Sequence, residues 1–515
     1  MSTGNPYSVQ TFRRNLPYFI FGKAGNGLLN FLCFLLVARV LPTTEYGYYV
    51  TAVASLELGL YVSSFGVEWP SALLVPSYRR HGNRKALEGF IGKLAMRQAI
   101  GHSIAAAILL LGADYIAGVM GIVGFAPTLQ VFGAIVLLEG CSRMVRDQFL
   151  NALLAQRAAQ GTQFLRNTAV FAFLIYAQAH GSSWAATDIA LLEAVGSGVS
   201  LLGGAIALRR HITSQMPMSN SDNDAKPLPA WGEATNMARN GYLSSLCTVA
   251  YGSQVLTLLV ASFLGPRSAA EFGFARTFVE QLGKYMPALL FMGMARPMFA
   301  DRYREHRDAR RLVDDLTLFL KVNLLIATPI VLFLGAYGHQ ILPYIASDSL
   351  QSVASVLSVV SLWLIANGLR RVIDTEAAVI GRSGLSMKCN LLLCLTPVVA
   401  GLQFENGLDV YGVGLILIVS EYVYGALMLY ALHADMRSAW SSWMPIIRLV
   451  LTVPLIAVAL REVPLALGPR GLLVGLAISG LIGVVLPFAL RTFRNGEWRS
   501  VIDLVSPIRR RNLNT

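Results

Sequence analysis

A long succession of apolar stretches, each long enough to cross a lipid bilayer as a helix, constrains this chain more than any other feature. A helix needs about 20 apolar residues to cross the hydrocarbon core. Only 14% of the residues are charged and the mean hydropathy is +0.55, which indicates that lipid is the main solvent. The chain is therefore expected to be an all-α polytopic membrane protein of about fourteen spans: 17–41, 46–70, 91–112, 122–142, 163–180, 187–208, 240–264, 270–295, 315–336, 351–372, 385–402, 410–432, 444–461 and 471–490.

The connections between these stretches alternate in charge. We assign 34 of the 42 Lys and Arg residues to the side that holds both termini, and four to the opposite side. Cytoplasmic loops carry an excess of Lys and Arg in membrane proteins. The pattern predicts that both termini are cytoplasmic, and it explains the formal net charge of +13 without a nucleic-acid partner.

Four cations are left over within the expected spans, namely Lys23, Arg276, Lys284 and Lys321. A charge inside a span is costly, and it usually faces a water-filled cavity or a partner of opposite charge. These four are the candidate substrate-binding residues, and together they predict a cationic cavity.

Structural roles remain open for each of the four cations. Glu280 lies one helical turn from both Arg276 and Lys284, so it is able to neutralise them within the helix. Lys23 and Lys321 lie close enough to span ends to extend toward the interface, and Asp314 is a further candidate partner for Lys321.

Polar residues also recur at helical spacing on four of the expected spans, which is the pattern that a hydrated cavity requires. Arg276, Glu280 and Lys284 form such a stripe on the eighth span. The expected lining residues on the other spans are Asn26 and Asn30 on the first, Glu57 and Tyr61 on the second, and Tyr251 and Gln254 on the seventh.

Other intramembrane charges have simpler interpretations. Glu139 with Arg143, and Arg143 with Asp147, are spaced as i, i+4 pairs and are expected to be structural. Glu193 and Glu421 are lone acids within spans, and each is a candidate proton or sodium site.

The first and seventh spans end in similar sequences. Residues 35–49 read LLVARVLPTTEYGYY and residues 258–274 read LLVASFLGPRSAAEFGF, so a Leu-Leu-Val-Ala run leads in each to Glu-aromatic-Gly-aromatic. Both copies fall on the same expected side of the membrane. The pattern predicts two six-helix lobes related by a parallel pseudo-repeat.

The polar stretch 209–239 is expected to be a cytoplasmic linker between the two lobes. It separates an N-terminal lobe, 1–208, from a C-terminal lobe, 240–432. Two extra helices are expected in 433–490, followed by a basic cytoplasmic tail, 491–515.

The motif LLVARVLPTTEYGYY resembles the polysaccharide transporter branch of the multidrug/oligosaccharidyl-lipid/polysaccharide exporter superfamily, which holds the Wzx-type O-antigen and exopolysaccharide flippases. The resemblance implies translocation of undecaprenyl-pyrophosphate-linked oligosaccharide from the cytoplasmic to the periplasmic leaflet by alternating access. It also implies a location in the bacterial inner membrane. A polysaccharide polymerase and a chain-length regulator are candidate partners besides the lipid-linked substrate and membrane lipids.

The resemblance leaves neighbouring functions open. A peptidoglycan-lipid flippase and a multidrug/cation antiporter of the same superfamily are the alternatives, and a membrane glycan polymerase or ligase is a more distant one. The expected far-side loops are short, and the five Cys and seven His residues show no metal-ligand spacing. We therefore expect neither catalytic nor metal-binding residues, no cofactor and no enzyme activity, with proton or sodium coupling left open.

Overall fold

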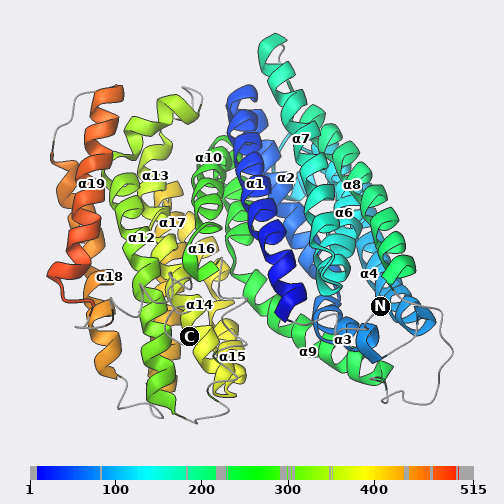
Figure 1. Cartoon of the computed structure of the whole chain (residues 1–515). Coiled ribbons are helices and arrows are strands. Elements are labelled where there is room, and N and C mark those ends of the chain that lie inside the picture. Colours follow the sequence, from blue (N-terminus) through cyan, green and yellow to red (C-terminus); the bar gives the residue numbers. More distant parts are fainter. Residues whose placement is uncertain are drawn as a thin grey trace. The chain divides into compact units, whose positions relative to one another are not determined.

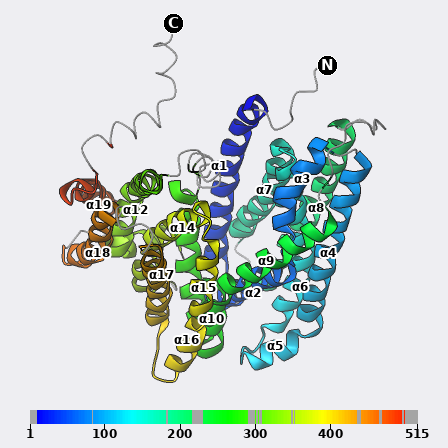
Figure 2. The ribbon, with the colours of Figure 1, turned by 90° about the horizontal axis from the view of Figure 1, so that it is seen from below.

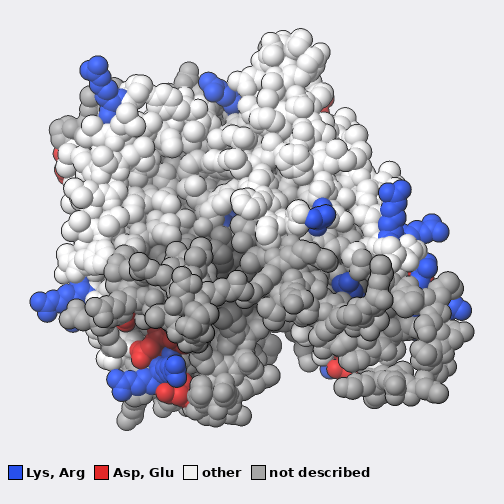
Figure 3. Space-filling model, viewed as in Figure 1, with Lys and Arg blue, Asp and Glu red and all other residues white. Residues whose placement is uncertain are grey.

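The computed structural model describes residues 9–81, 84–180, 184–215, 228, 230–289, 299, 303, 308–346, 350, 352–433, 440–463, 468–493 and 497. Within these ranges the regular structure is helical, and no strand occurs (Figure 1). The expected all-α polytopic fold is confirmed. Most of the described surface on the face in Figure 3 is uncharged, as a lipid-facing surface requires.

The described chain divides into two compact units, Met1–Phe274 and Ala275–Thr515. The first unit contains α1 (Val9–Val40), α2 (Thr43–Ser63), α3 (Glu68–His81), α4 (Arg84–Leu111), α5 (Ala113–Val119), α6 (Ala126–Arg143), the π-helix η1 (Met144–Leu150), α7 (Gln156–His180), α8 (Ala186–Gln215), α9 (Trp231–Ala250) and most of α10 (Ser253–Gly283). The lobe boundaries expected from the repeat stay a prediction.

The second unit is built around the long helix α12 (Ala309–Ile345), which packs against four neighbours. Its other helices are α13 (Val353–Val360), α14 (Trp363–Val379), α15 (Ser383–Leu393), α16 (Thr396–Phe404), α17 (Val410–His433), α18 (Trp440–Arg461) and α19 (Pro469–Ala489). The expected tail, 491–515, lies almost entirely outside the described residues.

Eleven described helices are long and apolar enough to cross a membrane, or twelve if the bent pair Thr43–Ser63 and Glu68–Arg79 is one span. The remaining two of the fourteen expected spans fall on α7 and on the end of α9 with the start of α10. α7 is less apolar because it packs on α1 through polar groups: Asn26 Nδ2 donates to the carbonyl oxygen of Gln160 at 3.0 Å and to its Oε1 at 3.1 Å.

The bend between α2 and α3 is 54° and is formed by a tight turn. Gly66 adopts φ +68 in this turn, and a Cβ there would lie 2.1 Å from the carbonyl oxygen of Ala238 in α9. Glycine permits both the backbone conformation and the close approach. The turn therefore seats α9 against the start of α3, and α9 runs across the ends of the neighbouring helices (Figure 2).

α9 begins at Trp231, inside the stretch expected to be a linker, and α8 extends into the same stretch as far as Gln215. Ala234 and Ala238 are buried, and the Trp231 ring meets Phe90 edge-on at 6.1 Å. This apolar face is too short and too interrupted for a span, so hydropathy alone does not reveal the helix. Residues 216–227 and 229 of the expected linker lie outside the described residues.

The two copies of the sequence repeat pack against each other within the first unit. A Cβ at Gly47 would lie 2.0 Å from the carbonyl oxygen of Pro266, and one at Gly273 would lie 2.8 Å from the Val50 side chain. The rings of Tyr46 and Phe274 are 6.4 Å apart. The glycine of each copy therefore allows the closest approach of α2 to α10.

Candidate functional site

A cavity of about 610 Å³ opens in the first unit between α2, α3, α4, α6 and η1. Carboxylates, a guanidinium, amides and an imidazole line its wall next to small and apolar side chains. The polar lining residues are Glu57, Tyr61, Ser64, Glu68, Gln98, His102, Arg143, Asp147, Gln148 and Asn151. A polar cavity within membrane-spanning helices is the usual form of a transport site.

Arg143, at the end of α6, is the cation of this wall. Its two terminal nitrogens donate to the two carboxylate oxygens of Glu57 at 3.0 and 2.7 Å, and Nε donates to Glu139 Oε1 at 3.0 Å. The side chain remains 37% exposed. The planar guanidinium matches an oxyanion in a two-point contact, so a phosphate that enters the cavity is able to compete with Glu57 for it.

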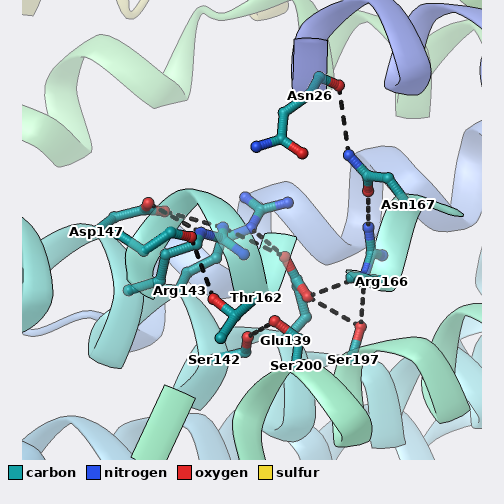
Figure 4. Close-up of polar contacts among 12 residues, drawn as sticks. Asn26, Glu139, Ser142, Arg143, Asp147, Thr162, Arg166, Asn167, Ser197 and Ser200 are labelled. Atoms are coloured by element: carbon teal, nitrogen blue, oxygen red, sulfur yellow. Dashed lines mark hydrogen bonds and ion pairs between the residues drawn. The ribbon is translucent and has the colours of Figure 1, made fainter. Parts of the chain in front are cut away.

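Behind Arg143 lies a buried ion cluster centred on Glu139, which is 3% exposed (Figure 4). Arg166 of α7 lies 3.4 Å from Glu139 Oε2, Arg146 lies 3.8 Å from Oε1, and the Ser197 hydroxyl donates to Oε2 at 2.9 Å. A carboxylate removed from water is tolerated only with such partners. The cluster joins α6, η1, α7 and α8.

Further ion pairs extend the cluster in two directions. Tyr49 donates to Glu193 Oε1 at 2.7 Å, and Arg166 lies 4.0 Å from the same carboxylate. On the cavity side Arg146 donates to Asp147 through two hydrogen bonds of 3.0 Å. The expected pair of Glu139 with Arg143 is present, while Asp147 takes its neighbour Arg146 as a partner.

His102 is buried at the cavity wall with a defined set of partners. Its Nδ1 lies 2.6 Å from the Ser63 hydroxyl, and its Nε2 lies 3.1 Å from Gln98 Nε2. Each ring nitrogen thus has a polar partner, as a buried imidazole requires. The sequence did not reveal this residue, because a lone histidine within an apolar helix carries no spacing signal.

The second unit holds a separate ion cluster, centred on Arg370 of α14. Arg370 donates to Glu421 Oε2 and to Asn390 Oδ1, each at 3.0 Å, and its Nε lies 3.8 Å from Asp374. The Arg370 guanidinium also lies 4.2 Å from the centre of the Tyr424 ring. The cluster joins α14, α15 and α17, and it engages Glu421, one of the two lone acids.

Two residues expected to line a cavity, Glu57 and Tyr61, do line the one described above. Three expected residues on α1 are not among its lining residues. Lys23 is exposed, Asn30 is half-buried, and Asn26 is buried against Gln160.

The remaining expected residues have local partners. Tyr251 and Gln254 lie at the break between α9 and α10, where Tyr251 is buried and Gln254 Oε1 accepts from the Ser253 hydroxyl at 3.3 Å. In the second unit Arg276 lies 3.7 Å from Glu280, and Lys284 donates to Gln281 Oε1 at 3.0 Å.

Lys321, on α12, is 1% exposed and donates to both carboxylate oxygens of Glu497 at 2.9 Å. Glu497 lies in the expected tail, 176 residues further along the chain. The second unit thus contains three of the four leftover cations, and the first unit contains Lys23.

The helices and their polar cavity define a polytopic membrane protein whose fold is shared with transporters of the MOP superfamily. A multidrug resistance MATE family transporter in an inward-facing conformation matches with a TM-score of 0.60 and 15% identity, over 81% of this chain and 96% of that one. The lipid II flippase MurJ matches with a TM-score of 0.52 and 12% identity, over 94% and 99% of the two chains.

A third structure with this fold is a MOP superfamily transporter from Pyrococcus furiosus whose binding pocket is described as having reversed polarity. It matches with a TM-score of 0.52 and 15% identity, over 82% of this chain and 95% of that one. No family model and no curated protein matches this chain. These likenesses establish the fold.

Proposed function

We propose that this protein is a flippase that moves undecaprenyl-pyrophosphate-linked oligosaccharide repeat units from the cytoplasmic to the periplasmic leaflet, for O-antigen or exopolysaccharide synthesis. The main observation in support is the extent of the fold match. The match to the lipid II flippase covers 94% of this chain, whereas the match to the MATE transporter covers 81%. The motif at 35–49 favours the polysaccharide branch over the peptidoglycan-lipid flippase.

The charges of the first unit fit an anionic, lipid-linked substrate. A pyrophosphate cannot cross hydrocarbon without compensation of its charge. Arg143 reaches the cavity as a two-point donor that is held in place by Glu57 and Glu139. We infer that the pyrophosphate displaces Glu57 from Arg143 while the glycan contacts the cavity amides and hydroxyls, and that the polyprenyl tail stays in lipid.

A second candidate is an exporter of organic cations, in keeping with the multidrug alternative. Three carboxylates, Glu57, Glu68 and Asp147, line the cavity beside a single arginine, and this excess of acid favours a cationic ligand. The two candidates differ in the charge of the substrate, so one assay separates them.

The test uses the purified full-length protein in proteoliposomes. A fluorescent undecaprenyl-pyrophosphate disaccharide is added, and the fraction that a membrane-impermeant quencher reaches is followed with time. We expect exchange between leaflets above that of protein-free vesicles, a loss of at least about tenfold in Arg143→Gln, and no change in Arg209→Gln, a matched exposed cation at the end of α8.

Exchange at the rate of empty vesicles, together with accumulation of a cationic dye, would overturn the flippase proposal in favour of the second candidate. In cells, loss of the protein is expected to abolish surface polysaccharide and to leave drug susceptibility unchanged. Adjacent glycosyltransferase and polymerase genes would support the same conclusion.

A further inference from the structure

A second hollow, separate from the transport cavity, lies on the outer face of α4. It has a volume of about 860 Å³ and is lined by Phe65, Gly89, Gly92, Lys93, Met96, Arg97 and Ile100. Six of these seven residues follow one another on α4 at spacings of one or three residues, so they share one helix face. Phe65, from the turn between α2 and α3, closes one edge of the hollow.

Two glycines make the floor of this hollow. Nothing lies within 4 Å of a Cβ placed at Gly89 or at Gly92, so the space over both residues is open. The Phe65 ring is held in place at the edge, because it meets the Tyr242 ring at 6.0 Å and would contact a Cβ at Gly101 at 2.8 Å. The hollow is therefore a shaped feature of the first unit.

The charge of the hollow is positive. Lys93 and Arg97 stand one turn apart on its wall, and no described carboxylate lies within 4 Å of either. The nearby acid of α4, Glu88, is engaged with Arg84 at 2.7 Å. Lys93 Nζ lies 5.7 Å from the centre of the Trp231 ring, which leaves its ammonium protons available.

An apolar stripe continues from the hollow along α4. Met96, Ile100, Ile104 and Ile108 are each half or more exposed and succeed one another every four residues. At 1.5 Å per residue the stripe is about 18 Å long, which matches one leaflet of hydrocarbon. The face thus presents a pair of cations at one end and a hydrocarbon surface at the other.

We propose that this face of α4 is a binding site for one anionic glycerophospholipid. Its headgroup alcohol lies over Gly89 and Gly92, its phosphate lies between Lys93 and Arg97, and an acyl chain lies along the stripe from Met96 to Ile108. A zwitterionic lipid fits less well, because its headgroup would bring a third cation to a wall that already carries two.

The test measures lipid binding to the purified full-length protein by native mass spectrometry. Phosphatidylglycerol and phosphatidylcholine with identical chains are titrated in parallel. We expect wild-type protein to prefer phosphatidylglycerol by roughly tenfold or more, and Lys93→Gln/Arg97→Gln to lower this preference to about twofold or less. Arg209→Gln/Arg210→Gln removes two exposed cations from the end of α8 and is expected to keep the preference.

A second variant separates shape from charge. Gly92→Leu fills open space on the helix surface, so it is expected to fold normally and to weaken the binding of both lipids equally. Equal binding of the two lipids by the wild-type protein, or an unchanged preference in the doubly neutralised variant, would overturn the proposal. Competition by an undecaprenyl-linked lipid with higher affinity than phosphatidylglycerol would also overturn it and assign the groove to the transport substrate.

Discussion

The two units each contain a buried ion cluster, and the clusters are opposite in sign. In the first unit one carboxylate, Glu139, meets the guanidiniums of Arg143, Arg146 and Arg166. In the second unit one guanidinium, Arg370, meets the carboxylates of Asp374 and Glu421.

In the order of the expected repeat these clusters occupy matching spans, the fourth, fifth and sixth in one lobe and the tenth, eleventh and twelfth in the other. Polar contacts therefore join the three corresponding spans in each lobe, while the central group has the opposite charge. The first cluster also reaches a cavity through Arg143 and Glu57. Under the proposed function, the acid-centred cluster holds Arg143 in place for an anionic substrate, whereas the contacts of Arg370 join helices of the second unit.

The largest expected effect comes from Glu139→Gln. The change leaves three guanidiniums close together without their common carboxylate, and breaking a buried pair in this way costs about 3–5 kcal/mol. Unfolding titrated with a denaturing detergent and followed by intrinsic fluorescence measures the loss. Glu88→Gln, in an exposed pair with Arg84, is the control and is expected to cost under about 0.5 kcal/mol.

Arg370→Gln is expected to cost less, about 2–4 kcal/mol. One of the two carboxylates left behind keeps other donors, because Asp374 accepts hydrogen bonds from Ser386 and from Tyr424. The same unfolding titration applies. A larger loss for Arg370→Gln than for Glu139→Gln would show that the sign of the central group does not decide the stability of a cluster.

Arg143→Gln separates the contribution of Arg143 to stability from its proposed contribution to substrate exchange. Its side chain is 37% exposed, so the expected loss of stability is only about 1–2 kcal/mol. The proposed function predicts that the same variant exchanges lipid-linked oligosaccharide between leaflets at least about tenfold more slowly than wild type. Arg143→Lys keeps the charge without the two-point geometry and is expected to recover part of the exchange. Full exchange by Arg143→Gln would mean that the cavity does not use this cation.

The smallest losses of stability are expected from removing a serine hydroxyl that donates a hydrogen bond to a carboxylate of each cluster. Ser197 donates to Glu139 at 2.9 Å and is fully buried, so Ser197→Ala is expected to cost about 1–2 kcal/mol. Ser386→Ala is expected to cost under about 1 kcal/mol, because Tyr424 still donates to Asp374. Equal losses in the unfolding titration would contradict the difference in support between the two clusters.

Short-range charge pairs could be predicted from spacing alone. Glu139 with Arg143, Arg276 with Glu280, and Arg370 with Asp374 each lie one helical turn apart and pair as that spacing indicates. The partners that give these residues a role come from far away, since Arg143 meets Glu57 at a separation of 86 residues and Arg370 meets Glu421 at 51.

The acids and cations without a partner nearby in the sequence also find their partners far along the chain. Glu193 accepts from Tyr49, 144 residues away, and Lys321 binds Glu497 across 176 residues. No periodicity within a helix carries such information. Tyr61 and Glu57 could be predicted as cavity residues because their helix face is polar, whereas Asn26 has the same spacing signal and is used to pack α1 on α7.

By itself the sequence determined that this chain is a bundle of membrane-spanning helices. Its apolar stretches are long enough to cross a bilayer, and a helix pairs all of its backbone groups internally, as lipid requires. It also indicated the short-range pairs of Glu139 with Arg143 and of Arg276 with Glu280, and the repeat, whose glycines mark a close helix contact. Only the tertiary structure decided which polar faces open to a cavity and which join two helices. Both faces look alike along one helix, and the difference depends on the neighbour that long-range packing brings against them.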